Sequence, residues 1–278
     1  MGLAMSEHAP DAAASNGTSS IDFSVPHSSR VWNYWLGGED NYAADRAAGD
    51  EVIDTIPDIP VGARAERAFL NRVIRHLVLD AGIRQFLDVG TGLPTMDNTH
   101  EVAQDLAPES RIVYVDNDPL VMLHARALLS STLEGPTDYV EADLRDPETI
   151  LQKSARTLDF SRPVGLMLLG VVNHIMDSEE SYRLVARLVE ALPAGSHLAL
   201  THSTAEVHGE PMLRVMREMN ERGGTPIRAR TRQEIEGYFE GLELLEPGVV
   251  SCSLWRPEPT GLGTPPEVYL FGGVGRVG

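Results

Sequence analysis

The sequence predicts an α/β protein built on a doubly wound, mostly parallel sheet with helices on both faces. Between residues 85 and 201, short apolar segments alternate with helical patterns, and the connections are short. The segment 164–169 is an uninterrupted apolar run, which is typical of a strand covered on both faces. With 278 residues, of which 42% are hydrophobic, the chain can bury the core of one large domain.

Each element follows from its local pattern. Strands are predicted at 85–89, 111–115, 137–141, 164–169 and 197–201. Helices are predicted at 98–106, where Asn98 and Glu101 stand at capping-box spacing, at 119–130, which starts with Pro119, and at 147–157 and 178–192. The extended segments 242–245, 249–254 and 268–272 are separated by Pro- and Gly-rich loops, so we expect antiparallel strands at one edge of the sheet.

The N-terminal part differs from the rest. Residues 1–22 are rich in small and polar side chains and are predicted to be a disordered tail. Trp32 and Trp35 carry too much apolar area for a free tail, so they are expected to dock on the main body. One helix is predicted at 41–54, where Pro57 and Pro60 end it, and a second helix at 64–79. We therefore expect a helical cap over 23–80 that forms one compact unit with a sheet domain over 81–278. The second helix is expected to have a solvated polar face, which is formed by Arg64, Arg67, Arg72 and Arg75.

Composition excludes several classes of protein. The chain has 41 acidic and 23 basic side chains, and its net charge of −18 argues against general nucleic-acid binding. The net charge does not exclude a local basic patch. No apolar stretch is long enough to span a membrane, and no signal peptide is evident. The single cysteine, Cys252, rules out an internal disulfide and a multi-cysteine zinc site, so no metal is expected and a cytoplasmic location is the simplest interpretation. The sequence leaves the oligomeric state open.

A glycine loop ends the first strand, in the stretch from Phe86 to Thr95. Gly90 and Gly92 allow a close approach of the backbone to a ligand, and ligands of parallel sheets bind at the carboxyl ends of the strands. A dinucleotide fingerprint needs a third glycine, but Thr95 stands there. Asp88 precedes the loop and would repel a diphosphate, whereas it suits a ligand with an ammonium group and no phosphate.

Three more markers follow in order, each at the end of a predicted strand. Asp116 stands where a carboxylate can accept both ribose hydroxyls, which fits NAD or S-adenosylmethionine. Asp143 can hold an adenine edge, and the segment 169–175 forms the floor where a cofactor meets a second substrate. Each carboxylate alone has an ordinary interpretation as a turn former or helix cap. Four markers in order indicate a nucleoside ligand.

These motifs resemble those of the Rossmann-like S-adenosylmethionine-dependent methyltransferases. The chain resembles most closely an actinobacterial family of these proteins, long described as a domain of unknown function, and the resemblance extends from about residue 25 to the C-terminus. It is carried by the stretches 25–46, 86–95, 98–104 and 113–119. The resemblance implies a seven-stranded sheet with one antiparallel strand and S-adenosylmethionine as cofactor, without indicating the methyl acceptor.

On this resemblance, each marker takes a role in the cofactor site. Asp88 lies near the methionine ammonium, through a water molecule, and Asp116 holds the ribose hydroxyls. Asp143 accepts from the exocyclic amine of adenine. The remaining residues are Gly90, Thr91 and Gly92 under the methionine and ribose, Asn117 and Leu144 beside the adenine, and Gly170 and Val171 on the sulfonium side.

The protein would hold a nucleophile in line with the methyl group of the cofactor. His174 is the best-placed general base if the nucleophile must lose a proton, and Tyr42 is the second candidate if the N-terminal segment folds over the pocket. That segment, 30–41, is expected to cover the cofactor, to dock Trp32 and Trp35 on the core, or both.

The acceptor is predicted to be a small molecule, and the loops 30–42, 173–180 and 202–230 are expected to build its pocket. Two other functions stay open at this stage: a cofactor-binding sensor without catalysis, and a nicotinamide-dependent oxidoreductase. We expect the basic residues to lie on the solvated surface; they are Arg228, Arg230 and Arg232.

Overall fold

The fold is taken from a computed structural model that describes residues 22–94, 97–121, 123, 135–259 and 263–278. The predicted disordered tail, apart from residue 22, lies outside these residues. Of the helix predicted at 119–130, residues 119–121 and 123 are helical, and the remainder also lies outside them.

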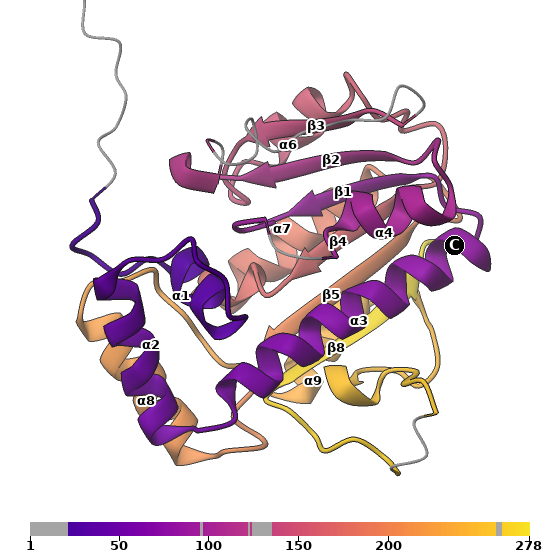
Figure 1. Cartoon of the computed structure of the whole chain (residues 1–278). Helices are drawn as coiled ribbons and strands as arrows, with labels where there is room; N and C mark the ends of the chain where they lie inside the picture. Colours follow the sequence, from indigo (N-terminus) through magenta and orange to yellow (C-terminus); the bar gives the residue numbers. More distant parts are fainter. Residues whose placement is uncertain (1–21, 95–96, 122, 124–134, 260–262) are drawn as a thin grey trace, which may run out of the picture.

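A mixed sheet forms the centre of the molecule (Figure 1). In the described residues it has eight strands, and its path runs β3-β2-β1-β4-β5-β8-β6, with β7 paired to β8 beside β6. The first five strands of this path are parallel, and β8 is antiparallel to β5. Their bounds are β1 Gln85–Val89, β2 Arg111–Asp116, β3 Thr137–Glu141, β4 Gly165–Leu169, β5 His197–Ser203, β6 Glu243–Leu244, β7 Val250–Ser251 and β8 Leu270–Arg276.

Both faces of the sheet are covered, as the apolar run at 164–169 predicted. Along β1, Phe86 belongs to the hydrophobic cluster of one face and Leu87 to the cluster of the other, because successive side chains of a strand point to opposite faces. Helices α3 (Ile59–Leu79) and α4 (Thr99–Leu106) complete the first cluster, and α6 (Pro147–Ser154) and α7 (Ser178–Glu190) complete the second. The predicted doubly wound α/β class is confirmed.

The N-terminal helices lie beyond the carboxyl ends of the parallel strands (Figure 1). These are α1 (Ser28–Trp35) and α2 (Ala43–Thr55), and α8 (Glu210–Glu221) lies beside α2. Pro60 was predicted to end a helix, but it lies in the first turn of α3. Backbone N–H groups of the first turn have no partner within the helix, so the missing N–H of proline costs nothing there. Arg72 was predicted to be solvated, but its guanidinium donates to the carbonyls of Trp255 and Cys252.

The segment 202–230 was predicted to be a loop, but it contains α8. Met212, Val215, Met216 and Met219 recur at helical spacing along it, and the first three are buried. The sequence also left out the short helix α9 (Arg232–Glu236), whose N-cap Thr231 accepts from the backbone N–H of Glu234.

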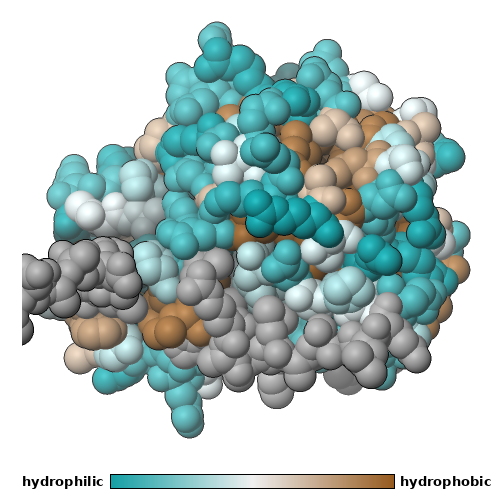
Figure 2. Space-filling view, turned by 90° about the horizontal axis from the view of Figure 1, so that it is seen from above, coloured by the Kyte–Doolittle hydropathy of each residue, from teal (hydrophilic) through white to brown (hydrophobic). Residues whose placement is uncertain are grey.

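The face of the molecule seen in Figure 2 is mainly hydrophilic in its coloured residues. Figure 2 shows one face, where hydrophobic side chains appear as patches between charged and polar ones. Among the described residues, no helix is both long enough and apolar enough to cross a membrane.

Candidate functional site

A cavity of about 510 Å³ opens at the carboxyl ends of the parallel strands. It lies where the strand order reverses between β1 and β4, which is the usual ligand site of a doubly wound sheet. The ten residues predicted to bind the cofactor all line it, together with His174. They are Asp88, Gly90, Thr91, Gly92, Asp116, Asn117, Asp143, Leu144, Gly170 and Val171.

Gly90 allows the segments that follow β1 and β4 to come close together. Gly90 has a φ of 76°, a left-handed conformation that favours glycine. A Cβ atom on Gly90 would lie 2.3 Å from Cβ of Val171, which follows β4. A side chain at position 90 would therefore push the two walls of the cavity apart.

Asp116 fixes the position of this loop. Its Oδ2 accepts from the backbone N–H of Gly92 at 2.8 Å, and its Oδ1 accepts from the N–H of Asp118 at 2.9 Å. Farther along the same edge, the amide of Asn117 donates to Oδ2 of Asp143 at 2.8 Å. The second and third predicted markers are thus part of one hydrogen-bonded rim of the cavity.

Asp88 is a buried carboxylate at the end of β1. The hydroxyl of Thr99 donates to its Oδ2 at 2.6 Å, and burial raises its pKa to about 6. The charge of Arg67, which also lines the cavity, opposes this rise in pKa. A cationic group in the cavity would favour the ionised form of Asp88.

A second buried carboxylate, Glu66 of α3, lines the same cavity and was not predicted from the sequence. The hydroxyl of Thr201 donates to its Oε1, and that hydroxyl accepts from the N–H of Gly170 at 2.8 Å. Burial raises the pKa of Glu66 to about 7. Glu66 shares a helical face with the core residues Phe69, Leu70 and Val73, and a charge on that apolar face was a signal available in the sequence.

His174 lies in a short 3-10 helix (η1, Val172–His174) after β4. Its Nδ1 donates to the carbonyl of Pro226 at 2.7 Å, since a carbonyl can only accept, so Nε2 carries the lone pair of the neutral ring. Burial lowers the pKa of His174, which keeps the ring neutral near pH 7.

Tyr42 is not among the residues that line the cavity in the described part of the chain. It is the N-cap residue of α2, and its ring packs against Phe23 with a centroid distance of 4.4 Å. The structure therefore brings one of the two predicted bases, His174, to the site and leaves the other outside it.

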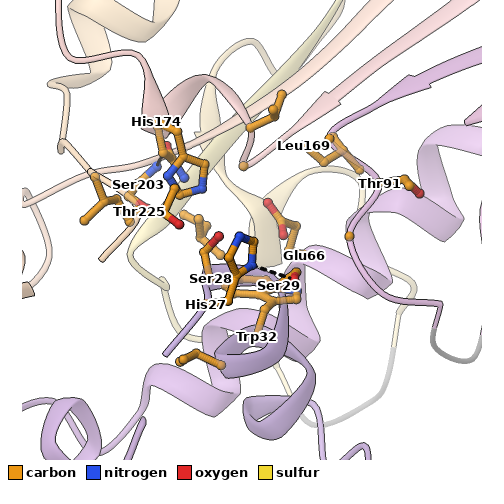
Figure 3. Close-up of a pocket in the computed structure, with 18 of the residues that line it drawn as sticks. His27, Ser28, Ser29, Trp32, Glu66, Thr91, Leu169, His174, Ser203 and Thr225 are labelled. Carbon is orange, nitrogen blue, oxygen red and sulfur yellow. Dashed lines mark hydrogen bonds between the residues drawn. The ribbon is translucent and has the colours of Figure 1, made fainter. Parts of the chain in front are cut away.

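The start of α1 covers the cavity. Figure 3 shows His27, Ser28 and Trp32 on one side, Glu66 behind them, and His174, Ser203 and Thr225 on the opposite wall. The hydroxyl of Ser29 donates to Oδ2 of Asp118 at 2.8 Å and so joins α1 to the Asp116 loop. Trp32 and Trp35 line the cavity and also pack against the core, so this segment forms part of the cavity wall and docks on the body.

Arg230, predicted to be solvated, is only 1% exposed. Its guanidinium donates to the carbonyl of Ile175 at 2.9 Å and to Nε2 of His202 at 2.6 Å. The Nδ1 of His202 donates to a carbonyl, and burial lowers the pKa of His202 to about 3, so its Nε2 is free to accept. Arg230 thereby holds the turn that carries His174.

The two buried carboxyls make stability depend on pH. Because the folded chain raises the pKa of Glu66 to about 7 and that of Asp88 to about 6, each is harder to ionise when folded than when unfolded. Their contribution to stability is full in acid and is lost as the pH rises toward 6 for Asp88 and 7 for Glu66, by at most about 1.4 kcal/mol per pH unit for each group.

We therefore expect Glu66→Gln to reduce the fall in Tm between pH about 5 and about 8. Thermal unfolding of the ligand-free protein measures this slope. Glu190→Gln, at an exposed position of α7, serves as the control and should keep the original slope. Equal slopes in all three proteins would show that Glu66 does not titrate in this range.

Comparison with known proteins identifies the family. The profile of the S-adenosyl methyltransferase family matches residues 14–278. A DUF574 family protein from Streptomyces avermitilis MA-4680 is 46% identical, with 91% of this chain and 98% of that chain covered and a TM-score of 0.86. A candidate methyltransferase from Thermobifida fusca YX is 39% identical, with 95% and 99% covered and a TM-score of 0.86.

A more distant structure shows the fold alone. The plantazolicin methyltransferase BpumL, solved in complex with S-adenosylhomocysteine, is 10% identical, with 90% of this chain and 95% of that chain covered and a TM-score of 0.51. No protein of curated function matches the chain in sequence. With the profile covering nearly the whole chain, the protein belongs to the S-adenosyl methyltransferase family, and its cofactor is S-adenosylmethionine.

Proposed function

We propose that this methyltransferase acts on a small-molecule acceptor held in the cavity beside the cofactor. The observation that carries the proposal is that the glycine loop, Asp88, the rim formed by Asp116 and Asp143, His174 and the start of α1 all line one cavity. A cavity of this size is typical of small-molecule sites.

The residues present fit the cofactor. Asp88 suits its ammonium group, through a water molecule, and Asp116 suits the ribose hydroxyls. A diphosphate, by contrast, would meet two buried carboxylates. Arg67, which the sequence analysis placed on a solvated face, offers a positive charge to the methionine carboxylate.

The remaining roles are those that the family resemblance implies, and all of these residues line the cavity. Asn117, Asp143 and Leu144 would flank the adenine, and Asp143 would accept from its amine. Gly90, Thr91 and Gly92 would lie under the methionine and ribose, and Gly170 and Val171 would face the sulfonium side. The cofactor supplies a methyl group on positively charged sulfur. The chain positions the acceptor in line, excludes water with α1, and takes up a proton at Nε2 of His174 when the acceptor must lose one.

Turnover with cell extract fractionated by size tests the proposal. The full-length protein is incubated with S-adenosylmethionine and either the dialysable or the macromolecular fraction, and S-adenosylhomocysteine is measured. We expect release with the dialysable fraction. Release only with the macromolecular fraction would refute a small acceptor, and cofactor binding without any turnover would favour the binding protein without catalysis.

His174→Asn is expected to lower kcat by about 10²- to 10⁴-fold, the usual contribution of a general base, with the affinity for S-adenosylhomocysteine unchanged. In the original enzyme, kcat should fall in acid as His174 becomes protonated, and the variant should lack this limb of the pH profile. His76→Asn, on α3, is the control. An unchanged kcat in His174→Asn would show that His174 is not the base.

A further inference from the structure

The cavity has a second half that the proposed cofactor residues leave open. Its walls are apolar and come from α1, α2, α3 and α8. They are formed by Trp32, Trp35, Val52, Ile59, Leu70, Met212, Val215, Met216 and Met219. Methionine side chains adapt to differently shaped partners, so this half suits an apolar or aromatic body.

One carboxylate lies between the apolar half and the cofactor half. Glu66 is 6% exposed, and a Cβ atom on Gly170 would lie 3.5 Å from its Oε1. Thr201 is the hydrogen-bond partner of Oε1, and no arginine, lysine or histidine forms an ion pair with Glu66 in the described part of the chain. Glu66 thus presents a buried carboxyl to the cavity, and the charge of Arg67 favours its ionised form without an ion pair to it among the described residues.

Two other polar side chains, Asn173 and Tyr269, line the same cavity. Nδ2 of Asn173 would lie 3.7 Å from that Cβ on Gly170, and the Oδ1 of Asn173 is already used by the N–H of Ser203. Tyr269 lines the cavity, is 3% exposed, and its hydroxyl has no hydrogen-bond partner among the described residues. A polar group of the acceptor placed here would therefore meet several polar groups at once.

Two simpler roles explain Glu66 less well. As a purely structural residue it would be costly, because burial disfavours its charge and raises its pKa to about 7 while one hydroxyl donates to it. As a partner of the cofactor's ammonium it would duplicate Asp88, which lies two residues before the glycine loop. A cation supplied by the acceptor accounts both for the burial of Glu66 from bulk solvent and for its position in the cavity wall.

Building on the proposed function, we propose that Glu66 binds the methyl acceptor and that the acceptor is a small amine attached to an apolar or aromatic body. The ammonium group pairs with Glu66, and the body packs between the tryptophans of α1 and the methionines of α8. The net charge of −18 also attracts cations to the protein.

The step balances with the residues at hand. The ammonium gives one proton to Nε2 of His174, and the freed electron pair of nitrogen forms the bond to the methyl carbon while the carbon–sulfur pair goes to sulfur. The products are the N-methylated ammonium, S-adenosylhomocysteine and a protonated His174. The bound ammonium favours the ionised form of Glu66, which holds the nitrogen.

Matched amines and alcohols test this proposal on the full-length protein. The probes are phenethylamine and tryptamine against 2-phenylethanol and tryptophol, which share their bodies but carry no charge. Binding to the protein saturated with S-adenosylhomocysteine and initial rates with S-adenosylmethionine are measured. We expect the amines, and not the alcohols, to bind and to be methylated.

Glu66→Gln should raise the KM for the amine by about tenfold or more, with a smaller change in kcat, because it removes the paired charge and keeps the shape. Its affinity for S-adenosylhomocysteine should stay within about twofold, and Glu66→Asp should recover part of the amine affinity. Glu190→Gln is the exposed control, and the cofactor titration also reports that each variant is folded.

Each other outcome overturns the proposal. Alcohols that bind as well as the amines would remove the need for charge, and unchanged amine kinetics in Glu66→Gln would remove Glu66 from the acceptor site. Lost cofactor binding in Glu66→Gln alone would place the residue in the cofactor half. Cofactor binding by the original protein without binding of either amine would refute the amine class and leave the proposed function standing, whereas failure of the original protein to bind the cofactor would refute both.

Discussion

Asp116→Asn is expected to weaken the binding of S-adenosylhomocysteine by about 10- to 100-fold, the effect of losing charge-assisted hydrogen bonds worth roughly 1.5–3 kcal/mol. Asp116 is 9% exposed and already accepts from the N–H groups of Gly92 and Asp118. An asparagine would turn its amide donors toward one of those N–H groups or toward the ribose hydroxyls. The loop and the ligand would then compete for a single acceptor.

Isothermal titration calorimetry measures this change, and a melting curve reports whether the variant is folded. Asp105→Asn, at an exposed position of α4, is the matched control and should bind like the original protein. A change in Kd of less than about threefold in Asp116→Asn would refute its role at the ribose, since even one neutral hydrogen bond usually contributes more.

Arg30→Met is expected to destabilise the N-terminal helices by about 3–5 kcal/mol, as is usual when one partner of a buried ion pair is removed. Arg30 is 3% exposed, and its Nε donates to both oxygens of Asp45, at 3.0 and 2.9 Å. Asp45 is fully buried and also accepts from the N–H groups of His27 and Tyr42. Without Arg30, the buried carboxylate of Asp45 would have only these two N–H groups as partners. We then expect α1 to detach from α2.

Because α1 covers the cavity, this variant should also bind S-adenosylhomocysteine more weakly. Urea unfolding and calorimetry measure the two effects, and Arg64→Met, at an exposed position of α3, controls for the loss of an arginine. Original stability together with original affinity would contradict the role of the pair. Lower stability with unchanged affinity would show that α1 docks on the core without closing the cofactor site.

The sequence predicted the sheet well because its strands carry a strong local signal. The segment 164–169 is apolar at every position from 166 to 169, and β4 lies there between β1 and β5. The positions of the four markers followed from the same rule, since residues at the ends of parallel strands gather at one edge. At the antiparallel edge, β8 runs to Arg276, four residues beyond the predicted segment, because Gly273 and Gly275 carry no apolar pattern of their own.

The residues that the sequence analysis misplaced depend on tertiary contacts. Arg230 looks like surface, and only the fold places Ile175 and His202 against it. Arg67 has the same appearance on α3, yet it lines the cavity. The α8 helix is a different case, because the spacing of Met212, Met216 and Met219 is itself a helical pattern that the sequence shows.

Calorimetry on the full-length protein determines whether the cavity between β1 and β4 is built for a sulfonium nucleoside. S-adenosylmethionine, S-adenosylhomocysteine and NAD are titrated separately into the folded protein. We expect saturable binding of the first two at one site per chain and no binding of NAD at the same concentrations. Binding of NAD with no binding of either adenosyl compound would contradict this expectation.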